Sequence, residues 1–86
     1  MLSEEDYAKF VKTLKERTEA IMKLESGTKW ARNGLLSDRT LWLNPSSTSL
    51  VRAHPDLRLD MIRANRQVEL ELFGEVTDLP GEEELL

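Results

Sequence analysis

Side chains that could carry out chemistry are scarce in this 86-residue chain, which has one histidine and no cysteine. His54 stands directly before Pro55, a position typical of the entry to a helix. A single histidine excludes the His-based metal sets and most Ser-His and Cys-His catalytic arrangements. The four glycines form no phosphate-binding loop. We therefore expect no catalytic residue, cofactor, metal or small-molecule substrate, and predict that the protein is not an enzyme.

Two carboxylates could suggest an acid–base or metal-binding pair. Asp56 and Asp60 are four residues apart, so a helix would place them on one face. Asp56 would lie in the first turn, where the helix dipole favours an acid, and Arg63 follows Asp60 as an ion-pair partner. We interpret both carboxylates as structural.

Basic residues beside aromatic ones suggest a second kind of site. Lys29, Arg32 and Arg39 lie close to Trp30 and Trp42, and such mixtures can neutralise phosphates and stack on bases. The competing explanation is an ordinary solvated face with ion pairs. Nucleic-acid binding through these three basic residues is kept as a weaker alternative to protein binding.

The charge is distributed unevenly along the chain. Residues 1–66 hold all twelve Lys and Arg against nine acids, whereas residues 67–86 hold seven acids and no base. Such a segment is typical of a flexible, solvated tail or of a segment that docks on a basic partner. The sequence has no apolar run long enough to span a membrane and no basic signal segment, so we expect a cytoplasmic protein that does not bind membranes.

Apolar periodicity predicts a mainly α fold with two long amphipathic helices. The first runs from about 4 to 25, with Ser3 as its N-cap and Gly27 as the left-handed residue after its end. The second runs from about 55 to 73, between Pro55 and Gly74. The apolar stripe of this second helix, called its seam below, consists of Leu57, Met61, Ala64, Val68 and Leu72.

The region between these helices is predicted as an extended, Trp-containing connector over 26–48. Its turn signals, among them Asn33-Gly34, are compatible either with a small hairpin of strands at about 28–32 and 39–43 or with an unpaired loop. A short helical turn at about 47–53 follows. Together these elements make a single domain over 1–74, followed by an acidic tail over 75–86.

Each of the two predicted helices has an apolar stripe on one face only, so a monomer would bury only a small hydrophobic core. A small core favours self-association or binding to a protein partner. Tryptophans in the connector, leucines off the helix seam and acids of the tail are the residues we expect to bind that partner: Trp30, Trp42, Leu59, Leu70, Glu82, Glu83 and Glu84.

The order of three short motifs resembles the C-terminal half of the small terminase subunits of tailed phages. The matching positions are Asn44-Pro45 after the connector, Leu72-Phe73-Gly74 at the end of the second helix, and Leu79-Pro80, within roughly residues 7–80. The segment between Asn-Pro and the closing glycine is longer here and contains Pro55, and the family's N-terminal segment is missing.

The resemblance implies a non-enzymatic, ring-forming DNA-packaging subunit. Its acidic tail would recruit the large subunit, and Lys29, Arg32 and Arg39 would touch DNA. The alternative from the residues themselves is a small helical protein, encoded by a phage or mobile element, that binds and modulates a host protein.

Overall fold

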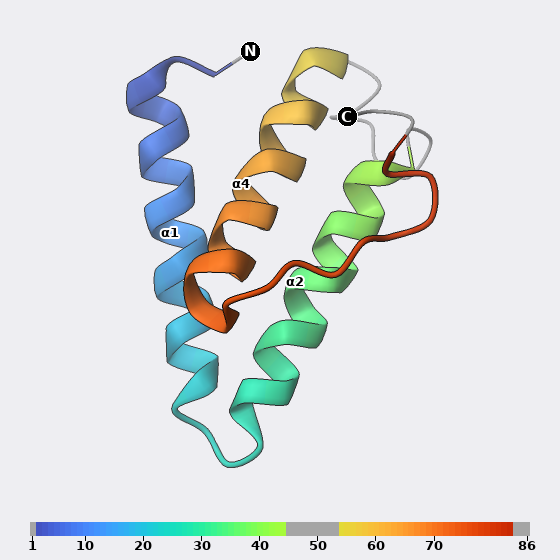
Figure 1. The fold of residues 1–86 in the computed structure, drawn as a ribbon. Helices are drawn as coiled ribbons and strands as arrows, with labels where there is room; N and C mark the ends of the chain where they lie inside the picture. The colour runs from blue at the N-terminus through green and yellow to red at the C-terminus, as the bar shows by residue number, and fades with distance from the viewer. Residues whose placement is uncertain (1, 45–53, 84–86) are drawn as a thin grey trace.

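The computed structural model describes residues 2–44 and 54–83, which form three α-helices and no β-strand. In chain order these are α1 (Glu4–Met22), α2 (Gly27–Leu43) and α4 (Pro55–Phe73) (Figure 1). The predicted mainly α fold is therefore confirmed. Within the described ranges, no helix is long and apolar enough to cross a membrane.

Helix α1 begins where its capping signal predicts. The Ser3 hydroxyl oxygen accepts a hydrogen bond from the Asp6 backbone N–H at 3.1 Å, satisfying one of the free donors of the first turn. Val11, Leu14 and Thr18 are the buried residues of this helix, and they follow one another at steps of three and four along one face. The helix ends at Met22, three residues before the predicted limit.

The turn from α1 to α2 is tight, and it corrects the predicted role of Gly27. Ser26, and not Gly27, takes the left-handed conformation, with φ of 59°. Gly27 begins α2 and is buried. A Cβ built on it would clash with the carbonyl of Ile21, so the glycine is needed for close approach of the chain and not for a positive φ.

The predicted extended connector is wrong over residues 27–43, which form α2. Neither the hairpin nor its strands at 28–32 and 39–43 exist. Gly27, Ala31, Leu35 and Arg39 recur every fourth residue and are the buried face of the helix. Tertiary packing on this face outweighs the turn tendency of Asn33-Gly34, because Gly inside a helix costs only about 0.5–1 kcal/mol relative to Ala.

Helix α2 ends at Leu43 with help from a later part of the chain. Arg58 of α4 donates from Nε to the Trp42 carbonyl at 2.7 Å and from Nη2 to the Leu43 carbonyl at 2.6 Å. Carbonyls of the last turn have no partner inside the helix, so a basic side chain there stabilises the end. The predicted helical turn at 47–53 lies outside the described residues.

Helix α4 matches its predicted range. It begins at Pro55 and ends before Gly74, whose φ of 79° is the left-handed cap conformation. Met61, Ala64 and Val68 of the predicted seam are buried.

The core lies where the three helices meet. Helices α1 and α2 diverge from their short turn, and α4 packs between them (Figure 1). Apolar side chains of all three fill the centre, with four more large side chains packed around it. The central residues are Val11, Leu14, Leu35, Ala64 and Val68; around them lie Tyr7, Phe10, Leu72 and Phe73.

The segment after α4 does not have the character of the predicted flexible tail. Residues 75–83 run back over α2 (Figure 1), and the Glu82 side chain is buried. The Thr77 N–H donates to Glu69 Oε2 at 3.2 Å, and the Leu79 N–H donates to Glu82 Oε2 at 3.0 Å. Over this range Glu82 is therefore part of the fold, whereas Glu83 remains exposed.

Candidate functional site

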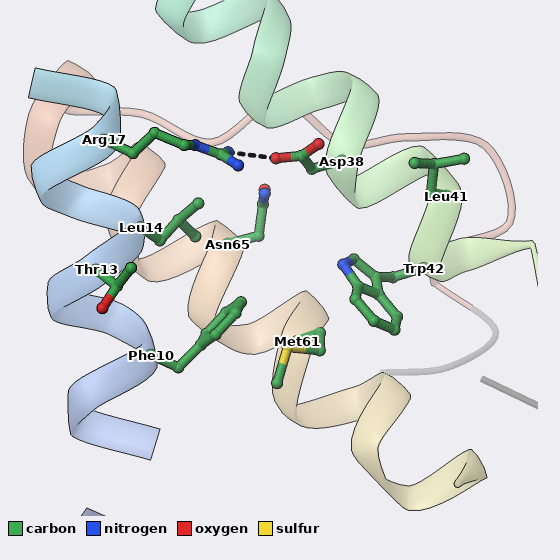
Figure 2. Close-up of a pocket in the computed structure, with 9 residues that line it drawn as sticks. All are labelled: Phe10, Thr13, Leu14, Arg17, Asp38, Leu41, Trp42, Met61 and Asn65. Atoms are coloured by element: carbon green, nitrogen blue, oxygen red, sulfur yellow. Dashed lines mark hydrogen bonds and ion pairs between the residues drawn. The ribbon is translucent and has the colours of Figure 1, made fainter. Parts of the chain in front are cut away.

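A pocket of about 270 Å³ opens between the three helices (Figure 2). Helix α4 lies between the divergent helices α1 and α2, and each of the three contributes to the pocket. Most of the surface that lines it is apolar. The lining residues are Phe10, Thr13, Leu14 and Arg17 of α1, Asp38, Leu41 and Trp42 of α2, and Met61 and Asn65 of α4.

One side of the pocket is closed by an ion pair. Arg17 of α1 donates from Nη2 to Oδ2 of Asp38 on α2, so the pair bridges the two diverging helices (Figure 2). Both side chains are partly exposed. The pair gives the otherwise apolar pocket a polar boundary and joins its two walls.

Asn65 brings a buried polar group to the same pocket. Its side chain is 2 % exposed, and its Nδ2 donates to the Leu35 carbonyl at 3.0 Å. Its Oδ1 is buried and accepts no hydrogen bond from the residues that the structure describes. An unmet buried acceptor costs about 1–3 kcal/mol, so Asn65 is a polar group that the fold retains at some cost in stability.

The pocket is suited to binding and not to acid–base chemistry. Its two ionisable side chains, Arg17 and Asp38, are bonded to each other. Within residues 2–44 and 54–83 no group of His, Cys, Asp and Glu side chains could hold a metal ion. The pocket therefore provides an enclosed shape and a mainly apolar surface.

A cluster of ion pairs holds α2, α4 and the segment 75–83 together. At its centre, Arg39 donates from Nη1 to Oε1 of Glu69 at 2.9 Å, and both side chains are 0 % exposed. Arg39 Nη2 also donates to the Thr77 carbonyl. Its Nε lies 3.7 Å from Glu82 Oε1. Charges buried this deeply are tolerated only when paired, and each of these is.

Arg66 is the second cation of the cluster. It donates to Glu82 and, at 3.5 Å, to Asp78. Burial acts to lower the pKa of Arg66, but the hydrogen bonds and attraction from Glu82 and Asp78 outweigh it, so the pKa is raised. The guanidinium therefore stays charged and keeps Glu82 in place.

Arg32 is the third cation, at the edge of the cluster. It lies 3.3 Å from Glu69 Oε2 and 3.3 Å from Glu75 Oε1, and donates to the Thr77 hydroxyl at 3.2 Å. Its guanidinium also stacks over the Phe73 ring, 5.6 Å from the centroid. These contacts explain why residues 75–77 lie against α2.

The residues predicted to contact nucleic acid are not brought together as a free basic surface. Arg39 is buried and Arg32 is paired with Glu69 and Glu75, so neither guanidinium is available to a phosphate in this structure. Lys29 is exposed.

The residues predicted to bind a partner are divided between surface and interior. Trp30, Leu59 and Leu70 are exposed, whereas Trp42 is half-buried and lines the pocket. Glu83 is exposed, but Glu82 is buried, which corrects its predicted role as a solvated docking acid. Glu84 lies outside the described residues.

Sequence reasoning identified one pocket residue, Trp42, as part of the binding surface, and missed the pocket itself. Phe10, Leu14 and Met61 have the spacing of residues that face a helical core. No local sequence pattern predicts that α1 and α2 diverge beside them and leave a pocket. The role of Arg39 was also missed. Its four-residue spacing from Ala31 and Leu35 was the available signal.

The fold and the pocket define a small three-helix domain over the described residues. Comparison with protein-family models, with curated proteins and with solved structures gave no significant match for this chain. The function therefore has to be argued from the pocket and its surroundings.

Proposed function

We propose that this protein is a non-enzymatic binding module that holds a side chain of a protein partner in the pocket between α1, α2 and α4. The observation that carries the proposal is a pocket of about 270 Å³ whose walls are mainly apolar. An engineered cavity of roughly 150 Å³ holds benzene, so this volume suits one large aromatic or aliphatic side chain.

The rim of the pocket supports a protein as the partner. Leu41 is 50 % exposed although it lines the pocket, and Trp42 stands beside it. Aromatic and large apolar side chains around a desolvated pocket are typical of the energetic centre of protein interfaces. The Arg17–Asp38 pair gives this centre a polar border.

A DNA-packaging role of the terminase kind would be one form of this function. A subunit with this role would also form an oligomer and would contact DNA. The resemblance depended on an extended connector, but residues 27–43 form α2. The contacts of Arg32 and Arg39 with carboxylates leave Lys29 as the exposed member of the proposed DNA-contacting set. Partner binding through the pocket is therefore the function that we propose.

Site-specific photo-crosslinking tests the proposal. A photoreactive phenylalanine analogue at Leu41 would be at the pocket rim, and the same analogue at Lys12 would be on the exposed side of α1, away from the pocket. In extract from the source cells, we expect one discrete adduct from position 41 and none from position 12. Adding the variant Thr13→Trp, which places a bulky group on the pocket wall, should remove the adduct.

Equal adducts from positions 41 and 12 would contradict the proposal. So would an adduct from position 41 that the pocket variant leaves unchanged.

A further inference from the structure

Residues 75–83 are held on helices α2 and α4 by charged side chains. Four residues make these contacts, and we call them the α2–α4 surface: Arg32 and Arg39 of α2, and Arg66 and Glu69 of α4. The segment itself adopts no helix or strand and runs back over α2 (Figure 1). It is therefore attached in the way that an extended peptide ligand attaches to a protein surface.

The Arg39–Glu69 ion pair binds the backbone of the segment. Arg39 Nη2 donates to the Thr77 carbonyl, and the Thr77 N–H donates to Glu69 Oε2 at 3.2 Å. Both polar groups of one backbone residue are thus bound by one ion pair. A sugar–phosphate backbone has no N–H donor for Glu69, and its phosphates would be repelled by that carboxylate. The pair therefore favours a peptide over a nucleic acid.

The remaining cations of the α2–α4 surface bind acidic side chains of the segment. Arg32 lies 3.3 Å from Glu75 Oε1. Arg66 donates to Asp78 at 3.5 Å and to Glu82, whose side chain is buried. Without the segment, the three guanidiniums of the surface would face the single carboxylate that belongs to it. The surface is therefore complementary in charge to a peptide with acids at these three positions.

A hollow of about 250 Å³ lies where the segment passes the end of α2. It is lined by Thr40, Leu43 and Asn44 on one side and by Leu79 and Pro80 of the segment on the other, and its walls are mainly apolar. The segment therefore leaves space unfilled beside Leu79. A peptide with a larger apolar side chain at this position would bury more apolar surface.

The segment begins directly after a backbone joint at Gly74, which has φ of 79° and open space around its Cα. Residues at the end of an element absorb the rotation when a segment moves. The side chains of Glu75 and Asp78 are 75 % and 86 % exposed, and ion pairs this exposed contribute little to stability. Attachment therefore depends mainly on Thr77 and Glu82, and the segment can separate at a lower free-energy cost than global unfolding.

We infer that the α2–α4 surface is a binding site for an acidic peptide of a partner protein, and that residues 75–83 occupy it as an autoinhibitory segment. The partner peptide has acids at the positions of Glu75, Asp78 and Glu82, and an apolar side chain larger than leucine at the position of Leu79. No residue of the α2–α4 surface lines the pocket between the three helices. The inference therefore goes beyond the proposed function and is tested separately from it.

Fluorescence anisotropy with a labelled synthetic peptide of residues 74–83 measures the binding. The titrated proteins are the full-length wild type and the full-length double variant Asp78→Lys/Glu82→Lys, whose segment presents cations to Arg66. We expect the peptide to bind the double variant at least about tenfold more tightly than the wild type, in which the segment competes. Leu79→Trp in the peptide should tighten binding a further three- to tenfold, roughly, by filling the hollow.

A second variant and a matched pair of arginine variants make the test specific. Thr77→Pro removes the N–H that Glu69 binds, and should also open the surface to the peptide. In the double variant, Arg66→Gln should weaken peptide binding about tenfold. Arg63→Gln, one turn earlier on α4 and paired with Asp60, should leave the binding unchanged.

Three results would overturn the inference. The first is the absence of saturable peptide binding to both opened variants, or equal affinity of these variants and the wild type. The second is tighter binding of a single-stranded DNA of equal charge than of the peptide, which would indicate a general polyanion site. The third is loss of helical circular dichroism in both opened variants, which would make the segment an essential part of the fold. Photo-crosslinking from position 41 tests the pocket and does not depend on any of these results.

Discussion

Arg39 of α2 and Glu69 of α4 form an ion pair at 2.9 Å with neither side chain exposed to solvent. The pair joins the two helices through residues that are 30 positions apart in sequence. The Thr77 backbone contacts both partners, so it also fixes the segment that follows α4. This relationship explains how α2, α4 and the segment after α4 are held together in a short chain with a small apolar core.

Removing Arg39 should therefore be strongly destabilising. We expect Arg39→Met to lower the free energy of unfolding by about 3–5 kcal/mol, because Glu69 would lose its fully buried partner and keep only the partly exposed Arg32. Urea denaturation followed by far-UV circular dichroism measures the change. Lys9→Met breaks only the exposed pair with Glu5 and should change the stability by less than about 0.5 kcal/mol. Similar losses in both variants would contradict the account of the cluster.

The two glycines of α2 should respond to alanine in opposite directions. Gly27→Ala places a Cβ against the Ile21 carbonyl and should cost about 1–3 kcal/mol. Gly34→Ala meets open space and should stabilise the helix by about 0.5–1 kcal/mol. Urea titrations of both variants and of the wild type measure the two changes. A loss of stability at Gly34 would mean that its surroundings are not open as described.

Glu82 should control how firmly the segment 75–83 is held. Glu82→Gln removes the charge that Arg66 and Arg39 face, so the N–H groups of Thr77 and Leu79 should exchange with solvent faster. Native-state hydrogen exchange by NMR gives the rates, and the matched control is Glu83→Gln at an exposed position. Equal effects of the two variants would support the freely solvated tail that charge composition predicts.

The parts of the fold that could be predicted are those with a strong local pattern. Helices α1 and α4 have apolar stripes of large side chains and clear ends at Ser3, Pro55 and Gly74. The buried face of α2 instead consists of Gly27, Ala31, Leu35 and Arg39, so its apolar periodicity is weak. Arg39, the charged residue of this face, is stabilised by Glu69 and by the Thr77 carbonyl. Both acceptors are distant in sequence, so no local pattern reveals them.

The candidate site was harder to predict for the same reason. The acids after Gly74 predict a solvated tail when taken alone, but they match the cations Arg32, Arg39 and Arg66 in space. Trp42, expected from sequence to bind a partner, is half-buried and lines the pocket. The pocket depends on the divergence of α1 and α2, which follows from tertiary packing.

An NMR titration of the protein with indole tests most directly whether the pocket is a binding site. We predict saturable shifts of the Asn65 side-chain amide and the Met61 methyl group, with no shift at Lys12 or Leu70. Shifts that fail to saturate, or that spread evenly over the exposed leucines, would contradict the assignment of this pocket as the functional site.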